Sequence, residues 1–212
     1  MSTIDPEIRR HWEDFLNPDV LRPRLIAASV YIAAYEALQG SVLDRLRDFF
    51  TTGFGQSGDI VDPTYQTNVL ARKRSSVYAS LDWLLEMHAI DDTDMAAFER
   101  VKSFRNRLAH ELLTLVGSRG LPPEYDERFA ELAALLRKID VWWIVNVGIA
   151  TDPDLAGRDI DPDEVIPGSM MSLQLLLEIA LGDEQRSRLY NDGFRAPDGG
   201  GRSDPGGSED RQ

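Results

Sequence analysis

Apolar residues recur three and four positions apart along most of this chain, the spacing that places them on one face of a helix. The longest such stripe predicts a helix from about Pro23 to Phe50, with the proline in its first turn, where it is well tolerated. Sustained alternation of apolar and polar residues, the pattern of a half-buried strand, is nearly absent. The sequence therefore predicts an all-α protein.

Turn residues divide this pattern into an up-and-down series of helices. Seven helices are expected, at about residues 5–15, 23–50, 65–88, 95–116, 123–147, 169–181 and 184–190. Asp92 or Thr93 is expected to cap the fourth. We predict a single domain over residues 1–193, with a core at about 23–150, extra C-terminal helices at 169–190 and a disordered tail at 194–212, which has no apolar content to bury.

Composition narrows the class of protein. The chain has 212 residues, of which 42% are apolar, and it has no cysteine, which excludes disulfides, thiol catalysis and cysteine metal sites. The N-terminus lacks an apolar signal region, and no uninterrupted run reaches the eighteen or so apolar residues that span a bilayer. These features predict a soluble, cytoplasmic protein with no membrane partner.

The formal net charge of −13 argues against general nucleic-acid coating and against DNA as a partner, because phosphate binding needs a basic surface. The charge is uneven, however. Between Thr67 and Gly120 the chain carries eight basic and seven acidic residues, so the acid lies mostly elsewhere. Any site for a phosphate-bearing ligand is expected in this central third.

The stretch SFRNRLAHEL, residues 103–112, places unusual polar residues in the predicted fourth helix. Phe98, Val101 and Leu108 keep an apolar spacing that position 105, an arginine, interrupts. At about 100° per residue, Arg105, Asn106 and His110 share one side of this helix. A guanidinium binds phosphate oxygens, an imidazole exchanges protons near neutral pH and an amide orients either ligand or ring. Such a set could cleave RNA without a metal by promoting attack of the RNA's own 2′-hydroxyl on the adjacent phosphate.

The segment RNRLAH, Arg105 to His110, resembles the R-x4-H signature of HEPN domains (higher eukaryotes and prokaryotes nucleotide-binding), in which Asn, Asp or His typically follows the arginine. The order of predicted helices over about residues 23–150 agrees with the α-helical bundle of that family. The resemblance implies a metal-independent endoribonuclease, acting as a toxin or antiviral defence effector, in which two copies of the motif meet at a homodimer interface.

By position, the resemblance implies that His110 is the general base or acid, that Arg105 clamps the phosphate and that Asn106 is the orienting residue. One branch of the family has a tyrosine two residues after the histidine, which a partner nucleotidyltransferase modifies. This chain has Leu112 there, so silencing by that route is not expected. The acidic remainder of the chain could restrict the substrates to particular RNAs or require an activating partner, and an antitoxin is a further possible partner.

Several further residues are candidates for supporting roles. Glu36 could pair with Arg105 or tune His110, or could equally be a solvated carboxylate at the edge of its helix. The basic residues that could guide an RNA backbone, or form only a solvated charged face, are Lys102, Arg72, Lys73 and Arg74. No metal site or cofactor is expected, because the histidines lack partners at ligand spacing and the acidic DIDPDE stretch lacks the glycine of a calcium loop.

The hypothesis from the sequence is thus a HEPN-type bundle that cleaves RNA at a homodimer cleft. The alternative is a non-catalytic helical module that binds a nucleotide or a second protein through the same surface. A third possibility is a purely structural dimerisation domain, in which an acid such as Glu36 pairs internally with Arg105.

Overall fold

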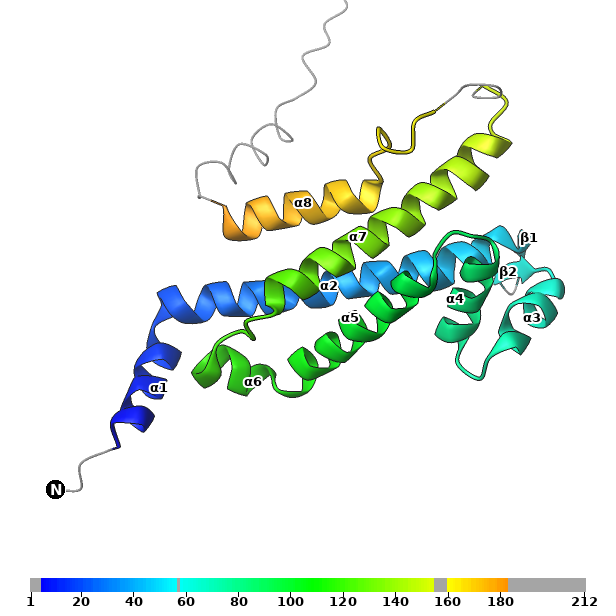
Figure 1. Ribbon diagram of the computed structural model, residues 1–212. Coiled ribbons are helices and arrows are strands. Elements are labelled where there is room, and N and C mark those ends of the chain that lie inside the picture. The colour runs from blue at the N-terminus through cyan, green and yellow to red at the C-terminus, as the bar shows by residue number, and fades with distance from the viewer. Residues whose placement is uncertain (1–4, 57, 155–159, 183–212) are drawn as a thin grey trace, which may run out of the picture.

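The computed structural model describes residues 5–56, 58–154 and 160–182, and these are mostly helical (Figure 1). Helix α1 (Pro6–Leu16) leads at Asn17 into α2 (Pro18–Phe49), the longest helix of the described chain. The Asn17 side chain caps α2 by accepting a hydrogen bond from the amide of Asp19 at 3.0 Å. The mostly helical architecture agrees with the all-α prediction.

Three long helices form the body of the protein. Helices α5 (Asp92–His110) and α7 (Tyr125–Trp143) pack against each other and against α2. The shorter α4 (Ser76–Glu86) packs on α2, and α8 (Gly168–Leu181) lies over α2 and α7 on the side away from α5 (Figure 1). This arrangement exposes one flank of α5, which carries the candidate motif.

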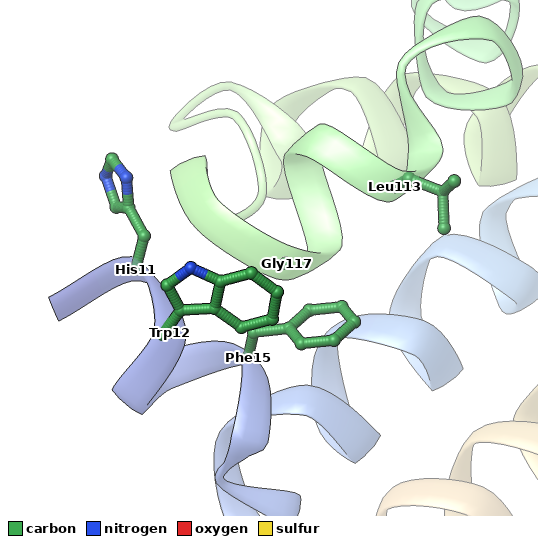
Figure 2. Close-up of a pocket in the computed structure, with 5 residues that line it drawn as sticks. All are labelled: His11, Trp12, Phe15, Leu113 and Gly117. Atoms are coloured by element: carbon green, nitrogen blue, oxygen red, sulfur yellow. The ribbon is translucent and has the colours of Figure 1, made fainter. Parts of the chain in front are cut away.

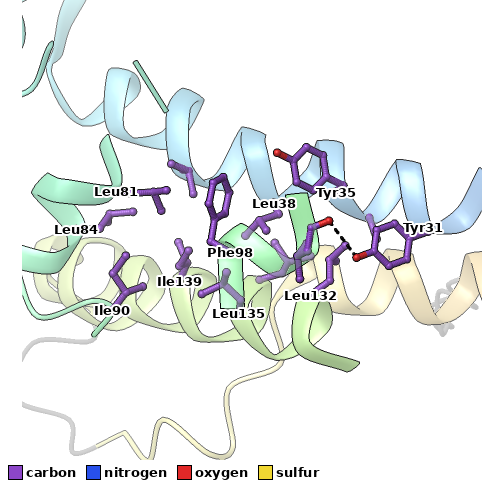
Figure 3. Packing of buried hydrophobic residues seen from close by; sticks show 14 of the residues in the cluster. Tyr31, Tyr35, Leu38, Leu81, Leu84, Ile90, Phe98, Leu132, Leu135 and Ile139 are labelled. Carbon is purple, nitrogen blue, oxygen red and sulfur yellow. Dashed lines mark hydrogen bonds between the residues drawn. The ribbon is translucent and has the colours of Figure 1, made fainter. Parts of the chain in front are cut away.

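The apolar faces of these helices meet in one core (Figure 3). Leu38 of α2, Phe98 of α5 and Ile139 of α7 are completely buried. The one polar atom of Tyr31 in this core is satisfied, because its hydroxyl donates to the carbonyl oxygen of Val101 at 3.3 Å. Burial raises the pKa of this phenol well above its ordinary value, so Tyr31 stays neutral in the folded state.

The glycine-rich stretch between the helices expected at 23–50 and 65–88 contains a small β-hairpin. Strands β1 (Thr51–Gly55) and β2 (Gly58–Val61) pair antiparallel, with Phe54 opposite Asp59. Gly58 has a φ of 111°, a conformation that favours glycine. The sequence did not reveal these strands because both faces of the hairpin are largely exposed, so no alternation of apolar and polar residues is required.

Two predicted helix boundaries were wrong at the N-terminal half. Helix α2 begins at Pro18, and Pro23 lies inside it rather than in its first turn. The helix expected at 65–88 is divided into α3 (Thr64–Asn68), the 3₁₀ turn η1 (Leu70–Arg72) and α4. The break comes at Lys73, which adopts an extended conformation. The sequence did not reveal it because Val69, before the break, is buried and keeps the apolar spacing of the predicted helix.

The helix expected at 95–116 is also interrupted. It begins after Asp91, which caps it in place of the expected Asp92 or Thr93, and it ends at His110. The short α6 (Leu112–Thr114) and a π-helical turn, η2 (Leu115–Arg119), follow. The helix expected at 123–147 continues from α7 into a second π-helical turn, η3 (Ile144–Ile149). The helix expected at 169–181 corresponds to α8, whereas the expected helix at 184–190 and the tail at 194–212 lie outside the described residues.

Among the described helices, α2 has the length and mean hydropathy of a membrane-spanning segment. Five apolar residues along one side of this helix, Ala28, Tyr31, Leu38, Val42 and Leu46, are nevertheless fully buried in the protein. A long core helix meets the same length and hydropathy criteria as a membrane span.

Candidate functional site

The structure places Arg105 at the edge of the buried face of α5. Phe98, Val101, Phe104 and Leu108 form that face, so Phe104 rather than position 105 continues the apolar series. A spacing of three, three and four keeps these four residues on one side of the helix. Our expectation that Arg105 interrupts the stripe was therefore wrong, and the arginine is half-buried beside it.

Arg105 is held by residues of α2. Its Nη2 atom donates to the Glu36 carboxylate at 2.8 Å, and its guanidinium carbon lies 5.4 Å from the centre of the Tyr35 ring. Its Nη1 atom makes a long, weak contact with the Asn106 side-chain oxygen at 3.5 Å. Its Nε atom is buried and has no hydrogen-bond partner within the described residues. The pair with Glu36 was one of the possibilities that the sequence suggested.

His110 is the last residue of α5 and its side chain is exposed. No hydrogen bond or ion pair joins it to Arg105 or Asn106 in the described part of the chain, although Asn106 is half-buried one turn away. Helix geometry separates Arg105 and His110 by about 7.5 Å along the axis. A substrate could touch both side chains, but one copy of the motif does not form a closed triad.

Lys102, one turn before Asn106, is engaged with α4. Its ammonium group donates to the Tyr78 hydroxyl at 2.7 Å and lies 4.5 Å from the centre of that ring, and the Tyr78 hydroxyl in turn donates to Glu99. The hydrogen bond with Tyr78 raises the pKa of Lys102, and the charge of Glu99 adds to this effect. Lys102 therefore remains charged at neutral pH, but its contacts hold it toward α4.

The basic cluster at residues 72–74 is largely neutralised. Arg72 pairs with Asp82 at 3.3 Å and with Glu86, and Lys73 pairs with Asp82 at 2.9 Å. The hydrogen bond from Lys73 is the main reason that the pKa of Asp82 is lowered. The sequence placed this cluster near the start of a long helix, whereas in the structure it precedes α4, with Arg72 in the η1 turn. Of the three residues, Arg74 alone is exposed without an ion pair inside the described residues.

Lys73, Arg74 and Tyr78 line a groove of about 460 Å³ at the start of α4. On α5 the groove is lined by Met95, near the start of the helix, and Tyr78 in its wall accepts a hydrogen bond from Lys102. The structure thus brings the proposed guiding residues near one end of the motif helix, which the sequence alone could not show.

A second polar groove, which the sequence reasoning missed, lies between α5 and α7. Its volume is about 640 Å³, and it is lined by Glu99, Arg100, Ser103, Phe104, Arg107, Glu124 and Arg128. Arg100 pairs with Glu131 at 2.7 Å, and Arg107 pairs with Glu124. The only signal in the sequence was the spacing of seven between Arg100 and Arg107, which places them on one helix face. Arg107 resembles Arg105 in its surroundings, because it pairs with one carboxylate, lies over the Phe104 ring and has a buried Nε atom without a partner among the described residues. It differs from Arg105 in that no described histidine lines this groove.

An apolar pocket of about 190 Å³ borders the C-terminal end of the motif (Figure 2). It lies between α1 and the α6–η2 segment and is lined by His11, Trp12, Phe15, Leu113 and Gly117. A Cβ atom at position 117 would lie 2.8 Å from the Phe15 ring, so glycine permits this close approach. Trp12 and Leu113 are 58% and 83% exposed, so the pocket opens onto an apolar surface.

The described residues contain no group of three or more His, Asp or Glu side chains that could hold a metal ion. No protein-family model, curated protein or solved structure matches this chain. The resemblance to HEPN domains therefore depends on residues 105–110 and on the order of the helices.

Proposed function

We propose that this protein is a metal-independent endoribonuclease of HEPN type, in which Arg105, Asn106 and His110 cleave RNA at a homodimer cleft. The observation that carries the proposal is that the half-buried Arg105, whose guanidinium is positioned by Glu36 and Tyr35, shares one flank of α5 with Asn106 and with the exposed His110. A phosphate is a natural ligand for such a fork of donors. His110, on the same flank, is exposed and free to exchange a proton with a bound ribose.

Two copies are proposed because cleavage by the 2′-hydroxyl needs both a general base and a general acid, and each chain supplies one histidine in the motif. The surface beside His110 is suitable for an interface, because Leu113 and Trp12 expose apolar area there. A symmetric contact would bring each residue of this surface against its equivalent patch in the second copy. The homodimer would thus place two histidines in one cleft.

Glu36 gives the proposed site a gate. Its carboxylate occupies the Nη2 atom of Arg105 and would repel an approaching phosphate, so RNA has to displace it. An activating partner could favour that displacement, and an antitoxin could oppose it. RNA cleavage controlled in this way fits a toxin or an antiviral defence effector acting in the cytoplasm, where cellular and phage RNA are found.

The test is incubation of the purified protein with structured RNA in EDTA, followed by analysis of the fragment ends. We expect the wild type to produce 2′,3′-cyclic phosphate ends. His110→Ala and Arg105→Ala should each lower the cleavage rate by at least about 100-fold, because removing an acid–base group or a phosphate clamp typically costs that much.

The matched control variant is Arg107→Ala, an arginine on the opposite side of α5. It should retain activity, with circular dichroism and sedimentation unchanged in all three variants. Cleavage retained by a pure His110→Ala preparation would refute the catalytic assignment.

A non-catalytic module remains the second candidate, and one observation favours it. The Arg105–Glu36 pair is already complete within a single chain, as expected for a residue with an internal structural role. This candidate predicts saturable binding of a nucleotide or RNA without fragments, and a binding defect rather than a rate defect in Arg105→Ala.

A further inference from the structure

Helix α8 is apolar around most of its circumference. Its sequence, GSMMSLQLLLEIAL, contains a single charged residue, Glu178. One side packs on the body of the protein through Leu173, which is buried, and through Met170 and Leu177. A helix with apolar residues on every side is normally covered on every side.

The opposite side of α8 is exposed. Met171, Leu175 and Leu176 have exposed fractions of 54%, 39% and 41%, and Ile166, just before the helix, is 71% exposed. We call these four residues the α8 outer face. Met171 and Leu175 lie one turn apart, and Leu176 lies at the edge of this face, where it also lines a pocket between α8 and α2. An amphipathic helix can pack its apolar side against such a surface.

The α8 outer face is held in place from behind. The Ser169 hydroxyl donates to the buried Asp140 of α7, which also accepts a hydrogen bond from Ser41 of α2. The first turn of α8 is thus fixed to the two central helices. A preformed surface loses little conformational freedom when a partner binds.

The charges near this face indicate which kind of partner could bind to it. Residues 160–182 carry four acids, Asp161, Asp163, Glu164 and Glu178, and no lysine or arginine. Arg137 of α7 reaches this segment but donates to backbone carbonyls, including that of Asp163 at 3.1 Å. The outer face is therefore an apolar stripe that follows a loop with three acids, has Glu178 as the single charged residue of its own helix, and carries no lysine or arginine of its own segment.

Three kinds of occupant can be compared on this basis. An anionic membrane surface would be repelled, because helices that lie on membranes carry lysine and arginine on their polar face. A second copy of α8 would present the same four acids and no lysine or arginine, so it offers no opposite charge to this face. A basic amphipathic helix would match both the apolar stripe and the acids. We propose that the α8 outer face is a docking surface for a basic amphipathic helix of another protein.

The probe for this surface is a fluorescein-labelled helical peptide with a leucine seam flanked by lysines, titrated with the full-length chain and followed by anisotropy. The matched probe has glutamates in place of the lysines. We expect saturable binding of the lysine peptide and binding of the glutamate peptide weaker by at least about tenfold. Binding of the lysine peptide should also weaken as salt rises.

Leu175→Ser removes a central apolar contact and should weaken binding of the lysine peptide by about tenfold. Leu113→Ser, at an exposed leucine on the other side of the molecule, is the matched control and should leave it unchanged, as should Arg105→Ala. If Leu175→Ser loses helical circular dichroism, the more exposed Met171→Ser replaces it.

Equal binding of the lysine and glutamate peptides would overturn the proposal. So would a dimer in sedimentation that Leu175→Ser dissociates, which would identify a second copy as the occupant, or flotation with phosphatidylserine vesicles, which would identify a membrane. None of these outcomes depends on RNA cleavage.

Discussion

Two polar clusters join α2 to a neighbouring helix, and they differ in completeness. Asp140 of α7 is 1% exposed and accepts hydrogen bonds from Ser41 of α2 and Ser169 of α8, with the Arg45 guanidinium 3.4 Å away. Arg105 of α5 pairs with one α2 carboxylate, Glu36, which is half exposed, and its Nε atom has no partner among the residues described.

The difference separates a structural cluster from a candidate site. A buried carboxylate is stable only when hydrogen bonds and an opposite charge replace water, and the Asp140 cluster provides both. The Arg105 cluster is partly exposed, with the arginine and Glu36 side chains 31% and 52% accessible, so a ligand can reach the guanidinium by displacing Glu36. We therefore expect substitutions in the first cluster to affect stability and substitutions in the second to affect binding.

The largest expected effect comes from Asp140→Ala. The substitution leaves two serine hydroxyls and Arg45 without their acceptor, and we expect it to lower the free energy of unfolding by about 3 kcal/mol. Urea denaturation followed by circular dichroism measures this change. Arg105→Ala is the matched comparison and should cost under about 1 kcal/mol, because half-exposed ion pairs contribute little. Equal losses in the two variants would remove the distinction between the clusters.

A smaller effect is expected for Glu36→Gln, which tests whether Arg105 is a binding group. Without the competing carboxylate the guanidinium is free for an anion, so affinity for inorganic phosphate should rise by up to about fivefold. NMR titration of the Arg105 side chain would measure this affinity. Glu124→Gln, next to Arg107 in the other groove, is the control and should leave phosphate binding at Arg105 unchanged. Unaltered affinity in Glu36→Gln would argue against a gate.

The smallest expected effect concerns a third, exposed cluster at the start of α5. Asp91 accepts hydrogen bonds from Lys138 and from the amides of Thr93 and Asp94, and these contacts lower its pKa to about 2. The charged form is the one that the fold stabilises. Its contribution is therefore complete above a pH of about 4 and is lost as the pH falls toward 2.

In Asp91→Asn this contribution should be lost at neutral pH, and stability should depend less on pH between about 4 and 2 than in the wild type. Carbon NMR of the Asp91 carboxyl group checks the pKa directly. A titration midpoint near 4 would show that the contacts with Lys138 do not persist in solution.

The helices could be predicted where packing and periodicity agree. The stripes of α2, α5, α7 and α8 are long, and each appeared in the sequence close to its observed position. The hairpin was missed because Phe54 and Ile60 are exposed on a two-stranded ribbon without a buried face. The helix breaks at Lys73 and Glu111 were missed because apolar residues continue on both sides of each break.

The candidate site was predictable only in part. Residue types and spacing placed Arg105, Asn106 and His110 on one flank of a helix and made Glu36 a possible partner. The neutralisation of Arg72 and Lys73 by Asp82 could not be read from spacing, since α4 had first to be separated from the turn that carries them. The hydrogen bond from Lys102 to the Tyr78 hydroxyl likewise depends on how α4 packs beside α5.

The sequence by itself determined the helical class and the chemistry available on the motif helix, because both follow from local periodicity and residue type. Only the tertiary structure decided which charges are neutralised and which stay available, because ion pairs such as Arg105 with Glu36 join residues 69 positions apart. It also decided that one side of α8 is buried and the other exposed, since a helix that is apolar on every side contains no signal for which side meets the core.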